Sequence, residues 1–431
     1  MIIHVIEPGD TIFSIANYYG VSQDWIIREN NIEYPNNLVI GSTLVILYPK
    51  TTHQVQEGDT LESIAKMYNV KVLDLLRYNS FLSDQEFLVI GEVLIIEYTD
   101  EKISEISVIG YSYTFIDEDI LRKTLPYLSY LIIYGFIIDQ NGRYINDDDI
   151  MIIEYAKTYG VAPIMHISLF SEEGIYESDI AHNILNDENL RNDIMESIIN
   201  NVIEKGYAGI SINPVYVYPS DRQFYIEFLT ELIGRIKSLG LLVLDTLIPN
   251  TFEIISDTFI LQEYIRTIDK LTDISILFPT SVGITIGAPS GTSRYLLMQE
   301  LLNYVLEYIP EEELSFGINT VGYIWDLPYI PGVSEGYAIS AESATNLARD
   351  YGISIQFDEG TQAAYFIFQD NDSESLVRFR DARTVVSYMQ LVDTYNLIGV
   401  GIWSIMDYFY ELWLIINSQY NIYKVDNKLL N

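Results

Sequence analysis

Carboxylates and aromatic rings are the side chains through which this chain could bind or transform a ligand. The sequence of 431 residues contains no cysteine, so it forms neither a disulfide framework nor a thiolate metal site. Its four histidines show no metal-ligand spacing, and there is no Ser-His-Asp elbow and no phosphate-binding glycine loop. We therefore expect no metal and no cofactor. The candidates that remain are the 61 acidic residues and the 35 tyrosines, whose rings suit sugar stacking and protein interfaces.

A Gly-Asp-Thr triplet occurs twice near the start of the chain, at residues 9–11 and 58–60. In each copy the triplet follows a short apolar run, and apolar residues then recur at helical spacing. Glycine permits a turn there, and Asp or Thr caps the next helix by accepting hydrogen bonds from its free N–H groups. A second helix, an asparagine and a closing apolar run complete each copy. The pattern predicts two β-α-α-β units, at residues 1–49 and 50–98.

This repeated pattern resembles the LysM domain. Both copies carry the triplet, the downstream asparagine and a Leu-x-x-Gly-x-x-Leu-x-Ile ending. The resemblance implies that peptidoglycan, or another N-acetylglucosamine-containing glycan, binds between the loop after the first strand and the loop before the second. A purely structural role of the triplet in the turn and cap is compatible with this. The implied glycan-binding residues are Gly9, Asp10, Thr11, Ile12, Leu38, Val39 and Ile40 in the first copy, and Gly58, Asp59, Thr60, Leu61, Leu88, Val89 and Ile90 in the second.

The longer part of the chain, residues 104–425, alternates apolar runs of strand length with helical segments such as 187–205 and 222–239. This order predicts an α/β fold, a (β/α)8 TIM barrel. A longer gap before the last run, at about residues 320–390, predicts a small inserted α+β unit. The eight runs begin at Val108, Leu131, Ala162, Gly209, Leu241, Ile274, Leu314 and Ile398.

The barrel region resembles family 18 glycoside hydrolases, in particular spore cortex-lytic N-acetylglucosaminidases, which carry two LysM repeats before the barrel. The resemblance implies a substrate-assisted reaction, an exception to the usual pair of carboxylates. In that reaction a Glu protonates the leaving oxygen, the substrate's acetamido oxygen attacks, and an Asp orients the acetamido group. The stretches that carry the resemblance are 206–222, 323–329, 338–340, 355–359 and 401–403.

The catalytic positions of that family hold other residues in this chain. The strand-four pattern Asp-Gly-x-x-x-Asp-x-Glu matches Ala208, Asn213 and Val215, and the tyrosine after strand six matches Thr280. Valine donates no proton and the amide carries no charge, whereas general acid catalysis alone contributes roughly 10²–10⁴ in rate. These positions therefore predict a pseudoenzyme, a chain with the family 18 fold and no catalytic activity.

Two further groups of residues bear on this prediction. Asp245, near the end of the fifth strand, is the best candidate for a replacement acid. The alternative is a buried acid that is paired with a neighbour or faces a helix. Asp407 and Glu411 are expected to be solvated loop charges. Trp403, Trp325 and Tyr111 could stack on a sugar in the barrel cleft or pack in the core.

The net charge of −37 argues against nucleic acid and membrane surfaces as partners, because it repels phosphates and anionic headgroups. No run of about 18 apolar residues occurs, and the first residues do not resemble a signal peptide. By resemblance, the protein is expected in the mother-cell cytosol and then in the spore envelope, in the region of cortex, coat or exosporium.

Three functions remain open at this point. The first is a non-catalytic glycan-binding protein of the spore envelope. The second is a structural protein that assembles with itself or with other spore-surface proteins. The third is an active N-acetylglucosaminidase with displaced catalytic residues.

Overall fold

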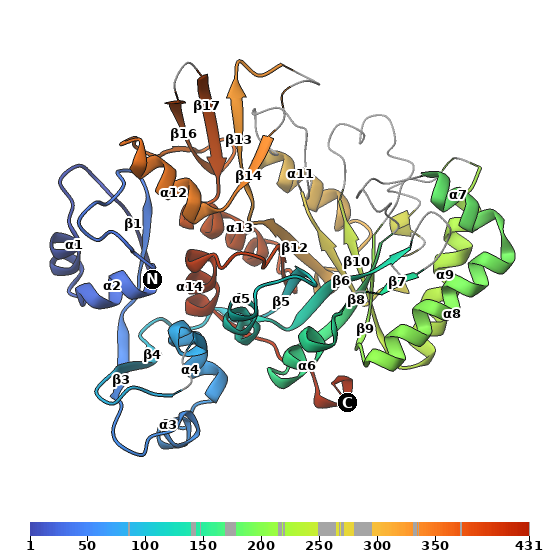
Figure 1. Cartoon of the computed structure of the whole chain (residues 1–431), viewed down its shortest axis with the longest axis horizontal. Coiled ribbons are helices and arrows are strands. Elements are labelled where there is room, and N and C mark those ends of the chain that lie inside the picture. The colour runs from blue at the N-terminus through green and yellow to red at the C-terminus, as the bar shows by residue number, and fades with distance from the viewer. Residues whose placement is uncertain are drawn as a thin grey trace.

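Two small units at the N-terminus precede a barrel that carries an additional sheet on one side (Figure 1). The computed structural model describes residues 1–84, 87–138, 144–146, 148–168, 178–213, 218, 220–248, 264–266, 268, 271–279, 295–330, 334, 336–370 and 373–430, and the structural statements below concern these residues.

The two N-terminal units have the predicted β-α-α-β order, and the two strands of each pair are antiparallel. Repeat 1 consists of β1 (Ile2–Val5), α1 (Ile12–Tyr19), α2 (Gln23–Glu29) and β2 (Thr43–Ile46). Repeat 2 consists of β3 (Pro49–Gln54), α3 (Leu61–Tyr68), α4 (Val72–Tyr78) and β4 (Val93–Tyr98).

The threonine of each Gly-Asp-Thr triplet is the N-cap of the helix that follows. Thr11 Oγ1 accepts a hydrogen bond from the Ser14 amide at 3.0 Å, and Thr60 Oγ1 accepts one from the Ser63 amide at 3.1 Å. The serine hydroxyl in turn accepts from the threonine amide, so both members of a capping box are present. Because these bonds satisfy amide groups that the helix cannot satisfy itself, each helix begins where the sequence predicts.

The asparagine after the second helix holds that helix to the closing strand. Asn30 Nδ2 donates to the carbonyls of Ile26 and Val45 at 3.0 Å, and its Oδ1 accepts from the Val45 amide at 2.7 Å. Asn79 makes the equivalent bonds to α4 and to Ile95 at 2.8–2.9 Å. This conserved arrangement between the two copies explains why an asparagine recurs at this position of the repeat.

Eight parallel strands close into the predicted barrel, because the first strand pairs with both the second and the last. Two short strands, β7 (Tyr144–Asn146) and β19 (Tyr420–Ile422), extend the sheet. The barrel strands are β5 (Ser104–Tyr113), β6 (Tyr130–Ile138), β8 (Ala162–Ser168), β9 (Gly209–Ile212), β10 (Leu242–Leu247), β11 (Ile274–Leu277), β12 (Leu314–Asn319) and β18 (Gly399–Trp403).

Helices surround the barrel and bury the outward side chains of its strands, as the period-two alternation of a strand requires. They are α5 (Glu118–Thr124), α6 (Ile150–Thr158), α7 (Ser178–Asn186), α8 (Glu188–Lys205), α9 (Arg222–Ser238), α11 (Tyr295–Val305), α13 (Ala382–Thr394) and α14 (Tyr410–Gln419).

The inserted α+β unit lies between β12 and α13. Its antiparallel sheet has the order β14-β13-β17-β16-β15, with α12 packed against it. The elements are β13 (Gly322–Leu327), β14 (Gly336–Ile339), α12 (Ala341–Asp350), β15 (Gln356–Asp358), β16 (Ala363–Asp370) and β17 (Ser373–Phe379). In Figure 1 this sheet stands beside repeat 1, with α12 nearest to it.

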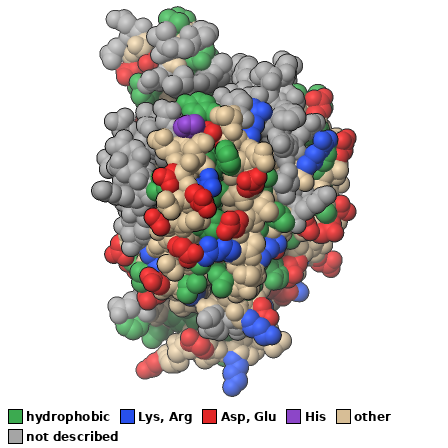
Figure 2. Space-filling model, turned by 90° about the vertical axis from the view of Figure 1, so that its right-hand side faces the viewer, with side chains coloured by type: hydrophobic (Ala, Val, Ile, Leu, Met, Phe, Trp, Pro, Cys, Tyr) green, Lys and Arg blue, Asp and Glu red, His purple; other side chains and the backbone are tan. Residues whose placement is uncertain are grey.

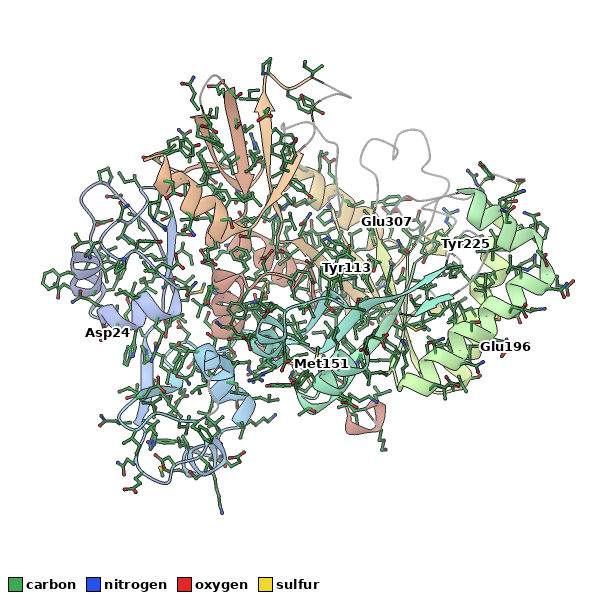
Figure 3. The ribbon with its side chains drawn as sticks, in the orientation of Figure 1. Asp24, Tyr113, Met151, Glu196, Tyr225 and Glu307 are labelled. Carbon is green, nitrogen blue, oxygen red and sulfur yellow. The ribbon has the colours of Figure 1, made fainter. Side chains whose placement is uncertain are left out.

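The surface on the side of α8 and α9 mixes charges of both signs, with acidic side chains more frequent than basic ones (Figure 2). Glu196 of α8, which Figure 3 labels, accepts a hydrogen bond from Arg235 of α9 at 2.5 Å. Within the described part of the chain, no helix has the length and hydropathy that crossing a bilayer requires.

Candidate active site in the barrel mouth and glycan-binding loops

Aromatic rings line the barrel at the carboxyl ends of β5, β6 and β18. The ring of Trp403 lies 5.4 Å from Tyr111 and 5.1 Å from Tyr134, measured between centroids. Tyr113, which Figure 3 shows among the barrel strands, lies 5.3 Å from Tyr134 and 6.1 Å from Trp403. The carboxyl end of the strands is where TIM barrels bind their ligands. The mouth is therefore a surface on which a sugar ring could stack.

Tyr111 is one of these aromatic residues, and its side chain is closed to solvent. Its side chain is fully buried, and its hydroxyl forms a hydrogen bond with Thr246 Oγ1 at 2.8 Å. Burial raises the pKa of the Tyr111 phenol far above its usual value, so the group stays neutral at physiological pH. Trp403 is 8% exposed. Both residues belong to one buried cluster inside the barrel, in which Trp403 keeps a small exposed area at the carboxyl end of β18 and Tyr111 keeps none.

Trp325, the third predicted stacking residue, belongs to the inserted sheet rather than to the barrel. It lies on β13, and its described ring contact is with Tyr323, at 5.7 Å between centroids. Trp325 is 6% exposed, so most of its ring is covered by the protein itself.

The sequence indicates that His166, on the third strand, could face the mouth, but it does not single out Tyr134; the two rings lie together on the inner side of the barrel. Their rings stack with centroids 4.0 Å apart, and His166 Nδ1 lies 3.3 Å from Ser211 Oγ. Burial lowers the pKa of the His166 imidazole to about 3, so the ring is neutral at physiological pH. The alternation of Tyr111, Tyr113 and Tyr134 along β5 and β6 is the sequence signal that could have identified this wall.

The strand-four positions are only partly described. Ala208 is buried, and Asn213 directly follows β9, where its carbonyl accepts a hydrogen bond from Tyr225 Oη at 3.1 Å. Tyr225 comes from α9, as Figure 3 shows, so the outer helix holds the chain at position 213. Val215 and Thr280 lie outside the described residues.

Asp245 does not face the mouth, so it is not a replacement acid. Thr246 bonds inward to Tyr111, and alternation along β10 therefore turns Asp245 toward the surrounding helices. There its Oδ1 accepts a hydrogen bond from Ser275 Oγ at 2.5 Å. The alternative stated from the sequence, a buried and paired acid on the helix side, is confirmed.

The two sets of glycan-binding loops predicted for the repeats differ in exposure. The Gly-Asp-Thr loops are open to solvent in both copies. The loop before the second strand is covered at Val39 in repeat 1, which is 6% exposed, and open at Val89 in repeat 2, which is 56% exposed.

A cavity of about 530 Å³ lies where repeat 1 meets α5, α12 and the start of α14. Val39 of repeat 1, Lys123 of α5, Glu342 of α12 and Glu411 of α14 are among the residues that line it. The expectation that Glu411 is a solvated loop charge is wrong, because Glu411 lies in the first turn of α14 and is only partly exposed. Burial raises the pKa of its carboxyl to about 7. Within the described ranges, no three histidine, aspartate or glutamate side chains converge as metal ligands would.

The architecture and the mouth define a TIM-barrel protein with two glycan-binding-type repeats, and the sequence comparisons identify its family. Residues 4–47 and 53–97 match the LysM domain, and residues 126–407 match the Glycosyl hydrolases family 18. The chain belongs to glycosyl hydrolase family 18 and carries two LysM domains before the barrel.

Relatives match nearly the whole chain. The cortical fragment-lytic enzyme of Bacillus subtilis (strain 168) is 27% identical over 428 residues, which cover 98% of this chain and 99% of that protein. The crystal structure of the spore cortex-lytic enzyme SleL of Bacillus megaterium QM B1551 is similar with a TM-score of 0.80 at 26% identity, over 98% and 99% of the two chains. A chitinase from Chromobacterium violaceum shares the fold, with a TM-score of 0.63 at 18% identity over 73% of this chain and 98% of that one.

These similarities contradict the prediction that the chain is not an enzyme, because the relatives that align from end to end are named as lytic enzymes. The physical reason is that substrate positioning contributes to rate independently of the main acid. Active sites that lose a principal group keep a residual rate enhancement. Substitutions at the four motif positions therefore do not establish the absence of activity.

Proposed function

We propose that the chain is a glycoside hydrolase that binds spore cortex peptidoglycan through its LysM repeats and cleaves N-acetylglucosaminyl bonds in the barrel mouth. The observation that carries the proposal is the end-to-end alignment with cortical fragment-lytic enzymes, which includes both repeats and the barrel. The aromatic wall around Trp403 supports it, since flat rings suit the apolar face of a pyranose.

The residue at position 213 retains part of the family's chemistry. The acetamido N–H of the substrate can donate to the Asn213 side-chain oxygen, which would hold the acetamido oxygen over the anomeric carbon. The carboxylate of the family would also balance the positive charge that develops on the acetamido group, and the neutral amide does not. Asn213 therefore orients the substrate without this electrostatic stabilisation.

The residue at position 215 has a larger effect on the rate. Valine cannot protonate the leaving oxygen, so in this proposal the proton comes from another group or from water. General acid catalysis contributes roughly 10²–10⁴ in rate. We expect the wild-type chain to cleave cortex glycan slowly, and the substitution Val215→Glu to raise the rate by a factor within that range.

Purified cortex peptidoglycan and mass spectrometry of the soluble fragments test the proposal. Wild-type protein should release fragments that end in N-acetylglucosamine, Val215→Glu should release them faster, and Trp403→Ala should release fewer. Asp245→Asn is the matched control, since Asp245 faces away from the mouth, and it should leave the products and their rate unchanged. If wild-type protein releases no fragments at any concentration, the proposed activity is refuted.

A further inference from the structure

The loop before the closing strand has the same sequence pattern in both repeats but a different environment. Val39 and Val89 occupy equivalent positions and are 6% and 56% exposed. At the next position, Ile40 is 39% exposed and Ile90 is 67% exposed. By the LysM resemblance, this loop is one of the two walls of the glycan groove, so its exposure decides whether a glycan can reach the groove.

In repeat 1 the inserted α+β unit covers this loop. Val39 belongs to a buried cluster with Ala344 and Ala348 of α12 and with Ile355. The Ile355 amide donates to the Ile40 carbonyl at 2.8 Å. A backbone acceptor and an apolar side chain of this wall are therefore already engaged by the protein itself.

The next residue of the loop fits closely against the insertion. Arg383 Nη2 donates to the Gly41 carbonyl at 3.0 Å. A Cβ atom added to Gly41 would lie 1.9 Å from the Ile355 carbonyl oxygen, whereas one added to Gly91 would meet no described atom within 4 Å. The two loops have the same backbone turn, and among the described residues the close approach of the insertion is to Gly41 and not to Gly91.

Repeat 2 attaches to the barrel by a different surface. Arg77 of α4 donates to the Pro126 carbonyl at 3.1 Å, and Tyr127 Oη donates to the Arg77 carbonyl at 2.8 Å. Arg122 of α5 donates to the Ser83 carbonyl at 2.8 Å. These contacts use the end of α4 and the turn after it, so the loop with Val89 stays free.

We propose that the two repeats have different roles, with repeat 2 binding the glycan strand and repeat 1 serving as a fixed connection between the repeats and the inserted unit. The inference rests on the proposed function, because the ligand is an N-acetylglucosamine-containing glycan strand. In repeat 2 the side chains of Phe87, Val89 and Ile90 are exposed, and the Gly91 amide that follows them donates to the Val55 carbonyl, just before the Gly-Asp-Thr loop. Exposed apolar residues gathered in one loop are typical of a binding surface.

The number of binding repeats has a measurable consequence. If both repeats bound the same strand, damage to one would leave the affinity of the other. If repeat 2 alone binds, a single substitution in its loop removes most of the affinity of the whole chain, and the equivalent change in repeat 1 has little effect.

Matched substitutions in the full chain test this inference. Ile90→Asp and Ile40→Asp place a charge at equivalent and exposed positions, and each variant is incubated on ice with insoluble cortex peptidoglycan and then pelleted. Ile90→Asp should weaken binding on the order of tenfold or more, and Ile40→Asp should stay within about twofold of wild type. Far-UV circular dichroism confirms that both variants are folded.

Hydrogen exchange provides a second readout that does not depend on a substitution. Bound peptidoglycan should add protection at the amides of residues 58–61 and 88–90 and should leave the exchange of residues 38–41 unchanged. Equal losses in the two variants, or protection gained in both loops, would overturn the division of roles alone. Failure of the wild-type chain to bind would overturn both this inference and the binding part of the proposed function.

Discussion

Repeats 1 and 2 show how the same local structure acquires two environments. Each has a His-Asp pair that joins its first strand to the Gly-Asp-Thr loop, at 3.1 Å between His4 and Asp10 and at 2.8 Å between His53 and Asp59. Each also has the threonine cap and the asparagine bridge. The repeats differ where the rest of the protein touches them, since the insertion packs on the loop of repeat 1 and leaves the loop of repeat 2 open.

The comparison teaches that a binding motif predicts a groove but not access to it. The residues that cover Val39 come from α12 and Ile355, more than 300 positions further along the chain. The loop has the sequence Leu-Val-Ile-Gly in both repeats, so its pattern does not indicate which copy is covered. Access depends on a docking contact that only a folded barrel and insertion can provide.

Gly41→Ala and Gly91→Ala should give the largest difference between the repeats. Both glycines have positive φ, at 84° and 91°, so alanine costs roughly 1–2 kcal/mol at either site. At Gly41 the added atom also displaces the Ile355 backbone, which removes the burial of Val39 and a hydrogen bond. We expect about 4–5 kcal/mol of lost docking there in total.

Amide hydrogen exchange at Ile355 measures this loss. The Ile355 amide should exchange much faster in Gly41→Ala and at the wild-type rate in Gly91→Ala. Equal exchange at Ile355 in both variants would contradict the docking contact on which the comparison depends.

Asn79→Ala and Asn30→Ala should separate the repeats by a smaller amount. Asn79 is 1% exposed, and its replacement removes the side-chain bonds to the Ile95 amide and carbonyl in a buried place, which costs about 3 kcal/mol. Asn30 is half-buried, so water can replace part of its bonding and we expect about 1–2 kcal/mol.

Exchange of the amides of α4 and α2 reports these local stabilities. Asn79→Ala should also reduce peptidoglycan binding, because it loosens the repeat that carries the open groove. If Asn30→Ala reduced binding as much as Asn79→Ala does, repeat 1 would contribute to the groove after all.

The interface between the two repeats should show an effect that depends on pH and does not exceed that of Asn79→Ala. Tyr98 Oη of repeat 2 donates to Glu29 Oε1 of repeat 1 at 2.5 Å, and burial raises the pKa of Glu29 to about 7. A raised carboxyl pKa gives stability that is fully present below about pH 4.5 and is lost as the pH rises through about 7. The loss is at most about 3 kcal/mol.

Glu29→Gln should flatten this pH dependence when unfolding of the repeats is followed between pH 4.5 and 8. Glu97→Gln, at a side chain that is 49% exposed and paired with Lys50, is the control and should leave the slope unchanged. A wild-type chain whose repeats gain stability over this range would refute the assignment. Glu411 lines the cavity between repeat 1, α5 and α12, and it should add a loss of stability with rising pH of the same sign.

Much of the fold could be predicted from local signals. The Gly-Asp-Thr caps and the asparagine bridge involve residues within about twenty positions of one another, so the sequence of each repeat is sufficient to indicate them. The barrel follows from apolar runs alternating with helices, and the longer gap before the last run correctly predicted an inserted sheet.

The direction in which a single side chain points could not be predicted from the sequence as well as the fold could. The run from Leu241 to Leu244 is apolar at every position, so its alternation does not reveal which face of the strand looks inward. From the sequence alone Asp245 is therefore a candidate acid. The Tyr111–Thr246 contact shows which face of β10 points inward, and Asp245 is on the other face. Glu411 looked like a loop charge because its burial comes from segments that are distant in sequence.

The sequence by itself determined the two repeats, the barrel, the insertion and the identities at positions 208, 213 and 215, because these depend on residue type and short-range spacing. Only the tertiary structure decided which repeat keeps its loop open, that Asp245 faces the helices, and that Tyr134 and His166 share the mouth with Trp403. The reason is that exposure and convergence arise from contacts between segments far apart in the chain, which local patterns do not encode.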